Sequence, residues 1–165
     1  MSNKSLLGIN KPDIVPRSSV RLSQYNGYGS VGTFIRRYLY SEVIGSDITY
    51  LDDPALGATM IINTPGVYAA GVSSQNKATS GVRPFGISKN ATATEIATAL
   101  TSIDESHIIG YSQVGFDFNG GAESMPQYSA FFIAKAGDVV RSHVNTAGAY
   151  TGIATQFYFY LTRVS

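Results

Sequence analysis

Short apolar runs separated by turn residues fill the chain from residue 33 onward. Gly, Pro, Asn and Asp stand between the runs, a spacing typical of β-sandwiches and β-barrels. The pattern predicts nine strands, over residues 33–40, 47–51, 58–63, 67–73, 83–88, 107–115, 127–134, 138–144 and 155–163. Nine short strands suit two packed sheets, so we expect an all-β fold.

Two of these strands carry large apolar side chains on both faces. In 155–163, Phe and Leu alternate with Tyr, and in 127–134 Phe131 and Phe132 fall on opposite sides. A strand with one face in water does not show this pattern. Either loops cover the second face or it meets another copy of the chain, and Tyr suits a partly hydrated contact. The candidates for such an interface are Phe132, Tyr158 and Tyr160.

The one helical pattern lies at 92–103, where Ile96, Leu100 and Ile103 follow the spacing i, i+4, i+7. The many Thr residues around them disfavour a long helix. The pattern leaves a short helix and a turn or loop equally open.

The first thirty residues have the features of an extended arm. Pro12 and Pro16 push the residues before them into extended geometry, so no helix can run through this segment. Residues 25–32 are rich in Gly and Asn, which indicates turns or a hinge. We therefore expect an N-terminal arm over 1–30 and one β-sandwich domain over 31–165.

Composition narrows the function classes. The 165-residue chain can bury one core, and it holds eleven Tyr, eight Phe, no Trp and no Cys. The lack of Cys excludes a disulfide framework, a thiolate metal site and a cysteine nucleophile. No signal-peptide pattern opens the chain and no apolar run reaches the ~18 residues that a membrane helix needs, so we expect a protein made in solution with no membrane partner.

Charge is unevenly distributed along the chain. Net charge is +1, yet residues 1–40 carry six bases and one acid, whereas the remainder has a net charge of −4. A basic, proline-punctuated arm with small apolar anchors suits docking along an acidic protein surface, with a disordered tail as the alternative. The candidate contacts in the arm are Leu6, Ile9, Lys11, Ile14, Val15, Arg17 and Arg21. Arg36 and Arg37 beside Tyr38 would also fit nucleic acid, but the acidic remainder of the chain argues against that partner.

No set of residues indicates catalysis. Gly27, Gly29 and Gly32 have dinucleotide-binding spacing, but a β-branched, aromatic segment follows them in place of a helix. His107 and His143 lie in different predicted strands, without a companion at metal-ligand spacing. We expect no catalytic residue, no metal and no cofactor, and therefore no enzyme.

The acidic group at Asp47, Asp52 and Asp53 could in principle bind calcium. Asp52 and Asp53 precede Pro54, however, and Asp followed by Pro is typical of a turn. The turn is the preferred interpretation.

Several motifs resemble a group of bacteriophage proteins. They are "IRR" at 35–37, "GSDITY" at 45–50, "ATMIINTPGVY" at 58–68, "FGISKN" at 85–90 and "AGDVVRSH" at 136–143, and the resemblance covers about residues 25–165. The "PGVY" strand start also resembles the jelly rolls of complement C1q and tumour necrosis factor. These motifs are structural and carry no catalytic group.

The resemblance implies a jelly-roll β-sandwich that associates through its aromatic face as a homodimer or homotrimer. In function it implies a capsid decoration, or cement, protein on the outer surface of a phage head, made in the host cytoplasm. Such a protein bridges neighbouring major capsid protein subunits. The alternative is a trimeric receptor-binding or adapter domain of a tail fibre, although this chain lacks the repetitive shaft that such domains usually carry.

Overall fold

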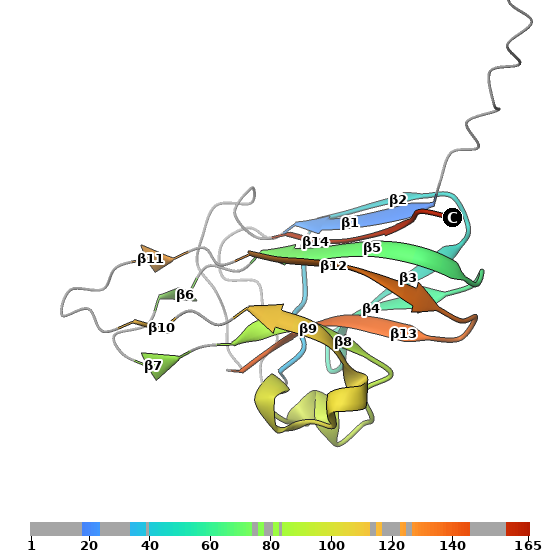
Figure 1. Cartoon of the computed structure of the whole chain (residues 1–165). Helices are drawn as coiled ribbons and strands as arrows, with labels where there is room; N and C mark the ends of the chain where they lie inside the picture. Colours follow the sequence, from blue (N-terminus) through green and yellow to red (C-terminus); the bar gives the residue numbers. More distant parts are fainter. Residues whose placement is uncertain are drawn as a thin grey trace, which may run out of the picture.

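A computed structural model describes residues 18–23, 34–38, 40–73, 76–77, 81–82, 84–112, 115–116, 123–124, 127–145 and 158–165. These residues form two five-stranded antiparallel sheets that lie face to face (Figure 1). The all-β sandwich predicted from the sequence is confirmed.

We name the two layers sheet A and sheet B. Sheet A has the order β12 (Gln127–Ala134), β5 (Gly66–Ser73), β14 (Tyr158–Arg163), β1 (Ser19–Ser23) and β2 (Tyr40–Ile44). Sheet B has the order β3 (Ile48–Asp53), β4 (Gly57–Ile62), β13 (Val139–Val144), β8 (Phe85–Lys89) and β9 (Ile108–Ser112). Neighbours in each sheet are mostly distant in sequence, so the chain crosses repeatedly between the layers.

Short elements lie outside the two sheets. Two-residue strands form two ribbons beside the sandwich, β6 (Asn76–Lys77) with β11 (Glu123–Ser124) and β7 (Gly81–Val82) with β10 (Gly115–Phe116). Three 3-10 turns lie below sheet B in Figure 1, η1 (Glu95–Ala97), η2 (Leu100–Ser102) and η3 (Glu105–His107). The pattern at 92–103 thus forms short turns, and Ile96, Leu100 and Ile103 are all buried.

The core fills the space between the sheets. Alternation along each strand turns every second side chain inward. Among the largest fully buried side chains are Tyr68 and Phe159 from sheet A and Met60, Phe85 and Ile87 from sheet B. The opposite side of each strand faces away from this core, and that side decides what the molecule can contact.

Strand β1 corrects the predicted arm. Val20 and Leu22 are fully buried, and β1 pairs with both β14 and β2. Residues 19–23 therefore belong to the sandwich, and the boundary placed at residue 30 is too late. The strand was missed because its period-two alternation spans only five residues and follows directly on the two prolines.

The strand predicted at 33–40 is also displaced. Residues 34–38 make a single bridge, between Ile35 and His143, and the regular strand β2 begins at Tyr40. The other eight predicted strands overlap observed ones.

The corner at 63–66 carries the chain from sheet B to sheet A. The Asn63 amide Nδ2 donates to the Ser46 carbonyl at 2.7 Å, and the Tyr68 hydroxyl donates to the Thr64 carbonyl at 2.6 Å. The Thr64 hydroxyl donates to Asp47 at 2.5 Å. Hydrogen bonds from Thr64 and Ser18, with the nearby Arg163, hold the pKa of Asp47 below its usual range. The corner is thus fixed to both sheets and to the C-terminal strand.

Candidate functional site

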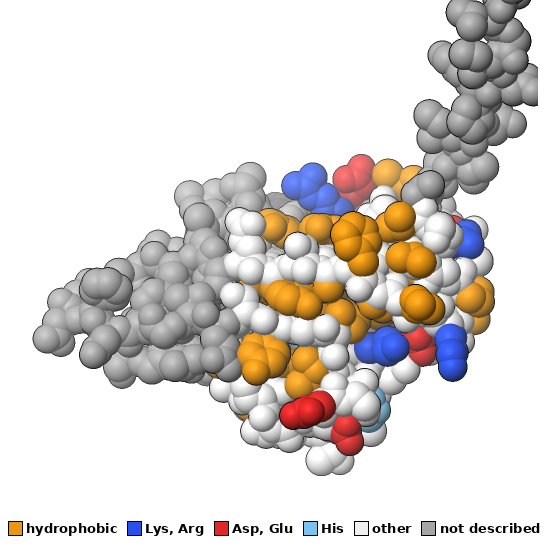
Figure 2. All heavy atoms as spheres, viewed as in Figure 1, with side chains coloured by type: hydrophobic (Ala, Val, Ile, Leu, Met, Phe, Trp, Pro, Cys, Tyr) orange, Lys and Arg blue, Asp and Glu red, His pale blue; other side chains and the backbone are white. Residues whose placement is uncertain are grey.

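The outer face of sheet A exposes large apolar side chains on its edge strand. In β12, Tyr128, Phe132 and Ala134 point toward the core, so Phe131 and Ile133 point away from it. Phe131 is 74% exposed and Ile133 is 76% exposed, the two highest values among the large hydrophobic side chains of the described residues. Figure 2 shows hydrophobic side chains gathered over the part of the molecule where Figure 1 draws β12 and β5.

Strand β5 contributes small residues to the same face. Val67, Ala69 and Gly71 alternate with the buried Tyr68 and Ala70. Gly71 lies under the ring of Tyr160, its register partner on β14, and an added Cβ would come within 2.3 Å of a ring carbon. The absence of a side chain at Gly71 therefore allows the tyrosine ring to lie flat on the sheet.

Tyr158 and Tyr160 of β14 lie next to β5 on the same outer face of sheet A. Their ring centroids are 6.0 Å apart and their planes differ by 25°, a stacked arrangement. Burial, followed by the neighbouring Tyr160, raises the pKa of Tyr158, and the nearby Arg21 opposes the shift. The Tyr158 hydroxyl therefore stays protonated at neutral pH.

The two tyrosines line a hollow of about 380 Å³ on the outer face of sheet A. Charged and hydroxyl groups from β1, β2 and β14 complete it, and Arg21 lies between Glu42 and Tyr160 in the sheet register. Its lining consists of Ser19, Val20, Arg21, Glu42, Tyr158, Tyr160 and Thr162. The outer face of sheet A thus combines exposed apolar side chains on β12 with a hollow at β14, two strands away, that is lined by aromatic, charged and hydroxyl groups.

The interface residues predicted from the sequence do not all share this face. Tyr158 and Tyr160 lie on it, whereas Phe132 lies on the core side of β12, with its ring centroid 6.2 Å from that of Tyr68. A contact through the outer face of sheet A therefore cannot include Phe132. Its neighbour Phe131 occupies the corresponding outer position, and Ile133 joins it.

The predicted arm contacts fall into two groups. Arg21 is an exposed residue of β1 within sheet A, so it does not belong to an arm. Leu6, Ile9, Lys11, Ile14, Val15 and Arg17 lie outside the described residues.

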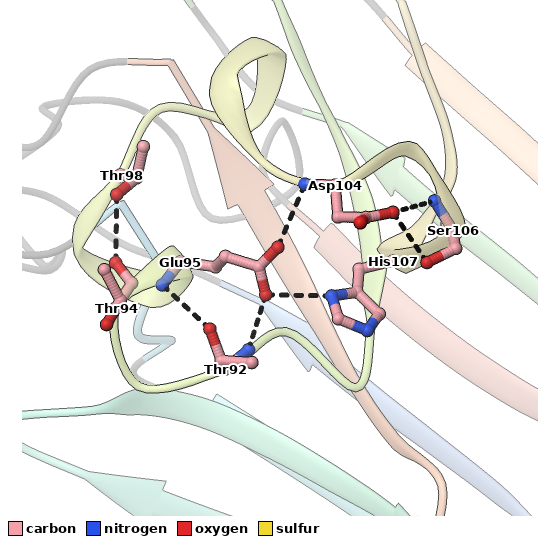
Figure 3. Close-up of polar contacts among 7 residues, drawn as sticks. All are labelled: Thr92, Thr94, Glu95, Thr98, Asp104, Ser106 and His107. Atoms are coloured by element: carbon pink, nitrogen blue, oxygen red, sulfur yellow. Dashed lines mark hydrogen bonds and ion pairs between the residues drawn. The ribbon is translucent and has the colours of Figure 1, made fainter.

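Glu95 and His107 order the turn segment below sheet B. Glu95 accepts backbone N–H groups of Thr92 at 2.8 Å and of Asp104 at 2.9 Å, and it lies 2.8 Å from Nδ1 of His107 (Figure 3). The Thr92 and Asp104 amides contribute most to holding the pKa of Glu95 at about 2. Glu95 therefore anchors both ends of the turn segment as a carboxylate.

The second histidine is buried on the outer side of sheet B. His143 is fully inaccessible, and its Nε2 lies 2.7 Å from the carbonyl oxygen of Thr98. Asp138, the acidic residue nearest to His143 in the sequence, accepts from Asn90 and from the Lys135 backbone. His143 and Asp138 are thus engaged with different partners.

The acidic turn behaves as the sequence indicated. Asp53 accepts the backbone N–H groups of Ala55 and Leu56, at 2.7 and 2.8 Å. Asp52 accepts two hydrogen bonds from Arg37, at 3.0 and 2.8 Å. In the described part of the chain, no group of three His, Cys, Asp or Glu side chains could hold a metal ion.

A signal for the exposed residues was present but incomplete. Alternation in "QYSAFFIA" places Phe131 and Ile133 on one side and Phe132 on the other. It does not say which side faces the core, because that depends on how β12 pairs with β5, where Phe132 is the register partner of Tyr68. Glu42 could not be placed from the sequence, because the strand predicted at 33–40 ends before it, whereas β2 spans Tyr40–Ile44.

Comparison with known proteins identifies the fold. No protein-family model matches the chain, and no curated protein matches it. The structure is similar to crystal structures of murine APRIL, a jelly-roll protein of the tumour necrosis factor family. At pH 8.0, pH 5.0 and pH 8.5 these give TM-scores of 0.63, 0.62 and 0.58, each at 10% sequence identity over 90% of this chain and 99% of the other.

The similarity establishes the jelly-roll architecture, in agreement with the expectation from the "PGVY" motif. At 10% identity it does not extend to function. Over the residues described, no helix is both long and apolar enough to cross a membrane. The fold of the chain is a jelly-roll β-sandwich, as in murine APRIL.

Proposed function

We propose that the protein is a structural jelly roll that associates with copies of itself through the outer face of sheet A. The observation that supports this most directly is the exposure of Phe131 and Ile133 side by side on β12, at 74% and 76%. Exposed apolar side chains that adjoin one another are typical of contact surfaces. Full burial of each would contribute roughly 1.5–3 kcal/mol to association.

A second copy is the partner that this face fits. The face carries both an apolar projection, Phe131 with Ile133, and a hollow floored by Tyr158 and Tyr160. When the projection of one copy enters the hollow of the next, the contact is heterologous and can close into a ring such as a trimer. When like patches meet around a two-fold axis, the result is a dimer.

Sedimentation of the purified chain tests the association. The monomer mass is 17.6 kDa, so we expect species of two or three times this mass at micromolar concentration. A single 17.6 kDa species at tens of micromolar would contradict self-association.

The biological setting that we propose is the outer surface of a bacteriophage head. The support is the motif resemblance over residues 25–165, together with a basic leader ahead of β1. In this setting the oligomer bridges neighbouring major capsid protein subunits, and several simultaneous contacts reinforce one another through effective concentration. The role is non-enzymatic.

Truncation tests the role of the basic segment that precedes β1. The deletion should span residues 2–17, because the Ser18 hydroxyl accepts the Asp47 backbone N–H at 2.9 Å and β1 begins at Ser19. We expect the truncated protein to fold and to associate as the intact chain does. Its binding to undecorated capsids should fall, and binding of the intact chain should weaken as salt increases.

Two results would contradict the capsid proposal. Equal retention of the truncated and intact chains on capsids would remove the leader from the contact. A copy number of a handful per particle, measured by mass spectrometry of purified virions, would place the protein at the tail. Hundreds of copies are expected for a head protein.

A further inference from the structure

Arg141 lies on the face of sheet B that points away from the core. It belongs to β13, where Val140 and Ser142 are buried on the core side. Its register partner on β8 is Ser88, and its Nε donates to the Thr59 hydroxyl on β4 at 3.2 Å. Thr59, Arg141 and Ser88 therefore form a row across three strands.

The guanidinium of Arg141 has no acidic partner in the described part of the chain. The ion pairs found there join Arg37 to Asp52, Lys89 to Asp138, His107 to Glu95 and Arg163 to Asp47. Arg141 is half-buried, and this burial lowers its pKa, with no neighbouring charge offsetting the effect. An unpaired charge that has lost part of its hydration is unfavourable, so such groups are usually paired in the functional state.

A second polar group without a partner belongs to Ser88, the register partner of Arg141 on β8. Ser88 is only 1% exposed, and its hydroxyl has no hydrogen-bond partner. Buried hydroxyls are nearly always satisfied. The Thr59 hydroxyl on the other side is engaged, because it accepts from Arg141 and lies 3.4 Å from the Gly57 carbonyl. The two terminal nitrogens of Arg141 and the Ser88 hydroxyl thus belong to register partners on neighbouring strands, and no group in the described chain accepts a hydrogen bond from them.

We propose that Arg141 and Ser88 form a binding site for an oxyanion, a carboxylate or a phosphate group. The planar fork of the guanidinium matches either group through two parallel hydrogen bonds, and the Ser88 hydroxyl supplies a third donor. Bound anion neutralises the charge of Arg141 and satisfies Ser88. The site lies on sheet B, so it is independent of the association proposed for sheet A.

Thermal unfolding in the presence of simple anions tests the site. Sodium phosphate and sodium succinate are titrated separately at constant ionic strength, with sodium chloride as the balance. Ligand that binds only the folded state raises the free energy of unfolding by RT ln(1 + L/Kd), where L is the free anion concentration, so the midpoint begins to rise near the dissociation constant and then climbs with the logarithm of the anion concentration. The expected result is a rise of the midpoint with this logarithmic dependence for at least one anion, and comparison of the two shows whether phosphate or carboxylate is preferred.

Matched variants separate specific binding from general salt effects. Arg141→Met and Ser88→Ala are the test variants, and Arg37→Met is the control because Arg37 already pairs with Asp52. We expect the rise of the midpoint to disappear in Arg141→Met, to require at least threefold more anion in Ser88→Ala, and to persist in Arg37→Met. Should Arg141→Met fail to fold, Arg141→Lys retains charge without the fork and should need at least tenfold more anion.

An equal rise in the wild type and Arg141→Met would overturn the proposal, because phosphate also stabilises proteins by exclusion from their surface. The absence of any rise in the wild type beyond that in Arg141→Met, with both anions, would overturn it as well. An unchanged anion requirement in Ser88→Ala would remove Ser88 from the site. Sedimentation of the same variants should show unaltered self-association, which keeps this result separate from the test of sheet A.

Discussion

Single residues hold the irregular segments of this protein, and Glu95 is the clearest example. One carboxylate accepts the Thr92 and Asp104 amides and contacts His107, so it joins the two ends of the turns below sheet B. In Glu95→Gln, one of these amides faces an NH₂ group in place of an oxygen. We expect the variant to lose about 1–3 kcal/mol of unfolding free energy at pH 7, measured by urea denaturation. Glu105→Gln, an exposed neighbour, is the control and should change little.

The pH dependence of this effect follows from the direction of the pKa shift. The pKa of Glu95 falls from 4.5 to about 2 in the folded protein. Its contribution is therefore complete above about 4.5 and is lost as the pH falls toward 2. The difference in unfolding free energy between wild type and Glu95→Gln should shrink over this range. A difference that stays constant down to pH 2 would contradict the role of the carboxylate.

His143 yields a second prediction at this scale. The Thr98 carbonyl can only accept, so Nε2 of His143 carries the proton and Nδ1 is bare, without a partner. Burial lowers the pKa of His143, while Arg141 adds to the effect and Glu95 opposes it. Nitrogen NMR should therefore show a neutral ring protonated at Nε2 at pH 6. A charged ring at that pH would contradict the buried placement.

At the scale of elements, the contact between β5 and β14 shapes the proposed interface. Gly71 lies beneath the Tyr160 ring, and an added Cβ would clash with it. We expect Gly71→Ala to displace the ring and to destabilise the fold by about 1–3 kcal/mol. In a Tyr160→Ala background the same change should be nearly neutral. A double-mutant cycle measures this coupling, and strictly additive effects would show that the ring does not depend on Gly71.

Strands were predicted correctly where the local apolar pattern determines them. They were missed where pairing with a distant strand determines them. The strands around "ATMIIN" and "QYSAFFIA" are strongly apolar and bounded by turn residues. Such patterns located eight of the nine predicted strands correctly. Strand β1 has only two apolar residues, Val20 and Leu22, and its place depends on β14 at the far end of the chain. Likewise, the sequence places Phe131 and Phe132 on opposite faces of the strand, but it does not say which face packs against the core.

At the scale of the whole molecule, fold and function rest on different observations. The two-sheet jelly roll could be predicted from strand spacing and from the motif at the 63–66 corner, and the similarity to murine APRIL confirms it. Tyr158 and Tyr160 of the candidate interface could also be predicted. Phe131, Ile133 and Glu42 could not, because their role arises only when β12 and β2 form the two edges of sheet A.

The central claim is that copies associate through the outer face of sheet A. Its most direct test is the dissociation constant of the oligomer, measured by sedimentation equilibrium for the wild type and for the double variant Phe131→Ser with Ile133→Ser. We expect the double variant to dissociate at least 100-fold more readily, because two apolar side chains leave the contact. The matched control is Leu51→Ser, since Leu51 is 49% exposed on the outer face of sheet B. Unchanged association in the double variant, or an equal loss in Leu51→Ser, would contradict the account.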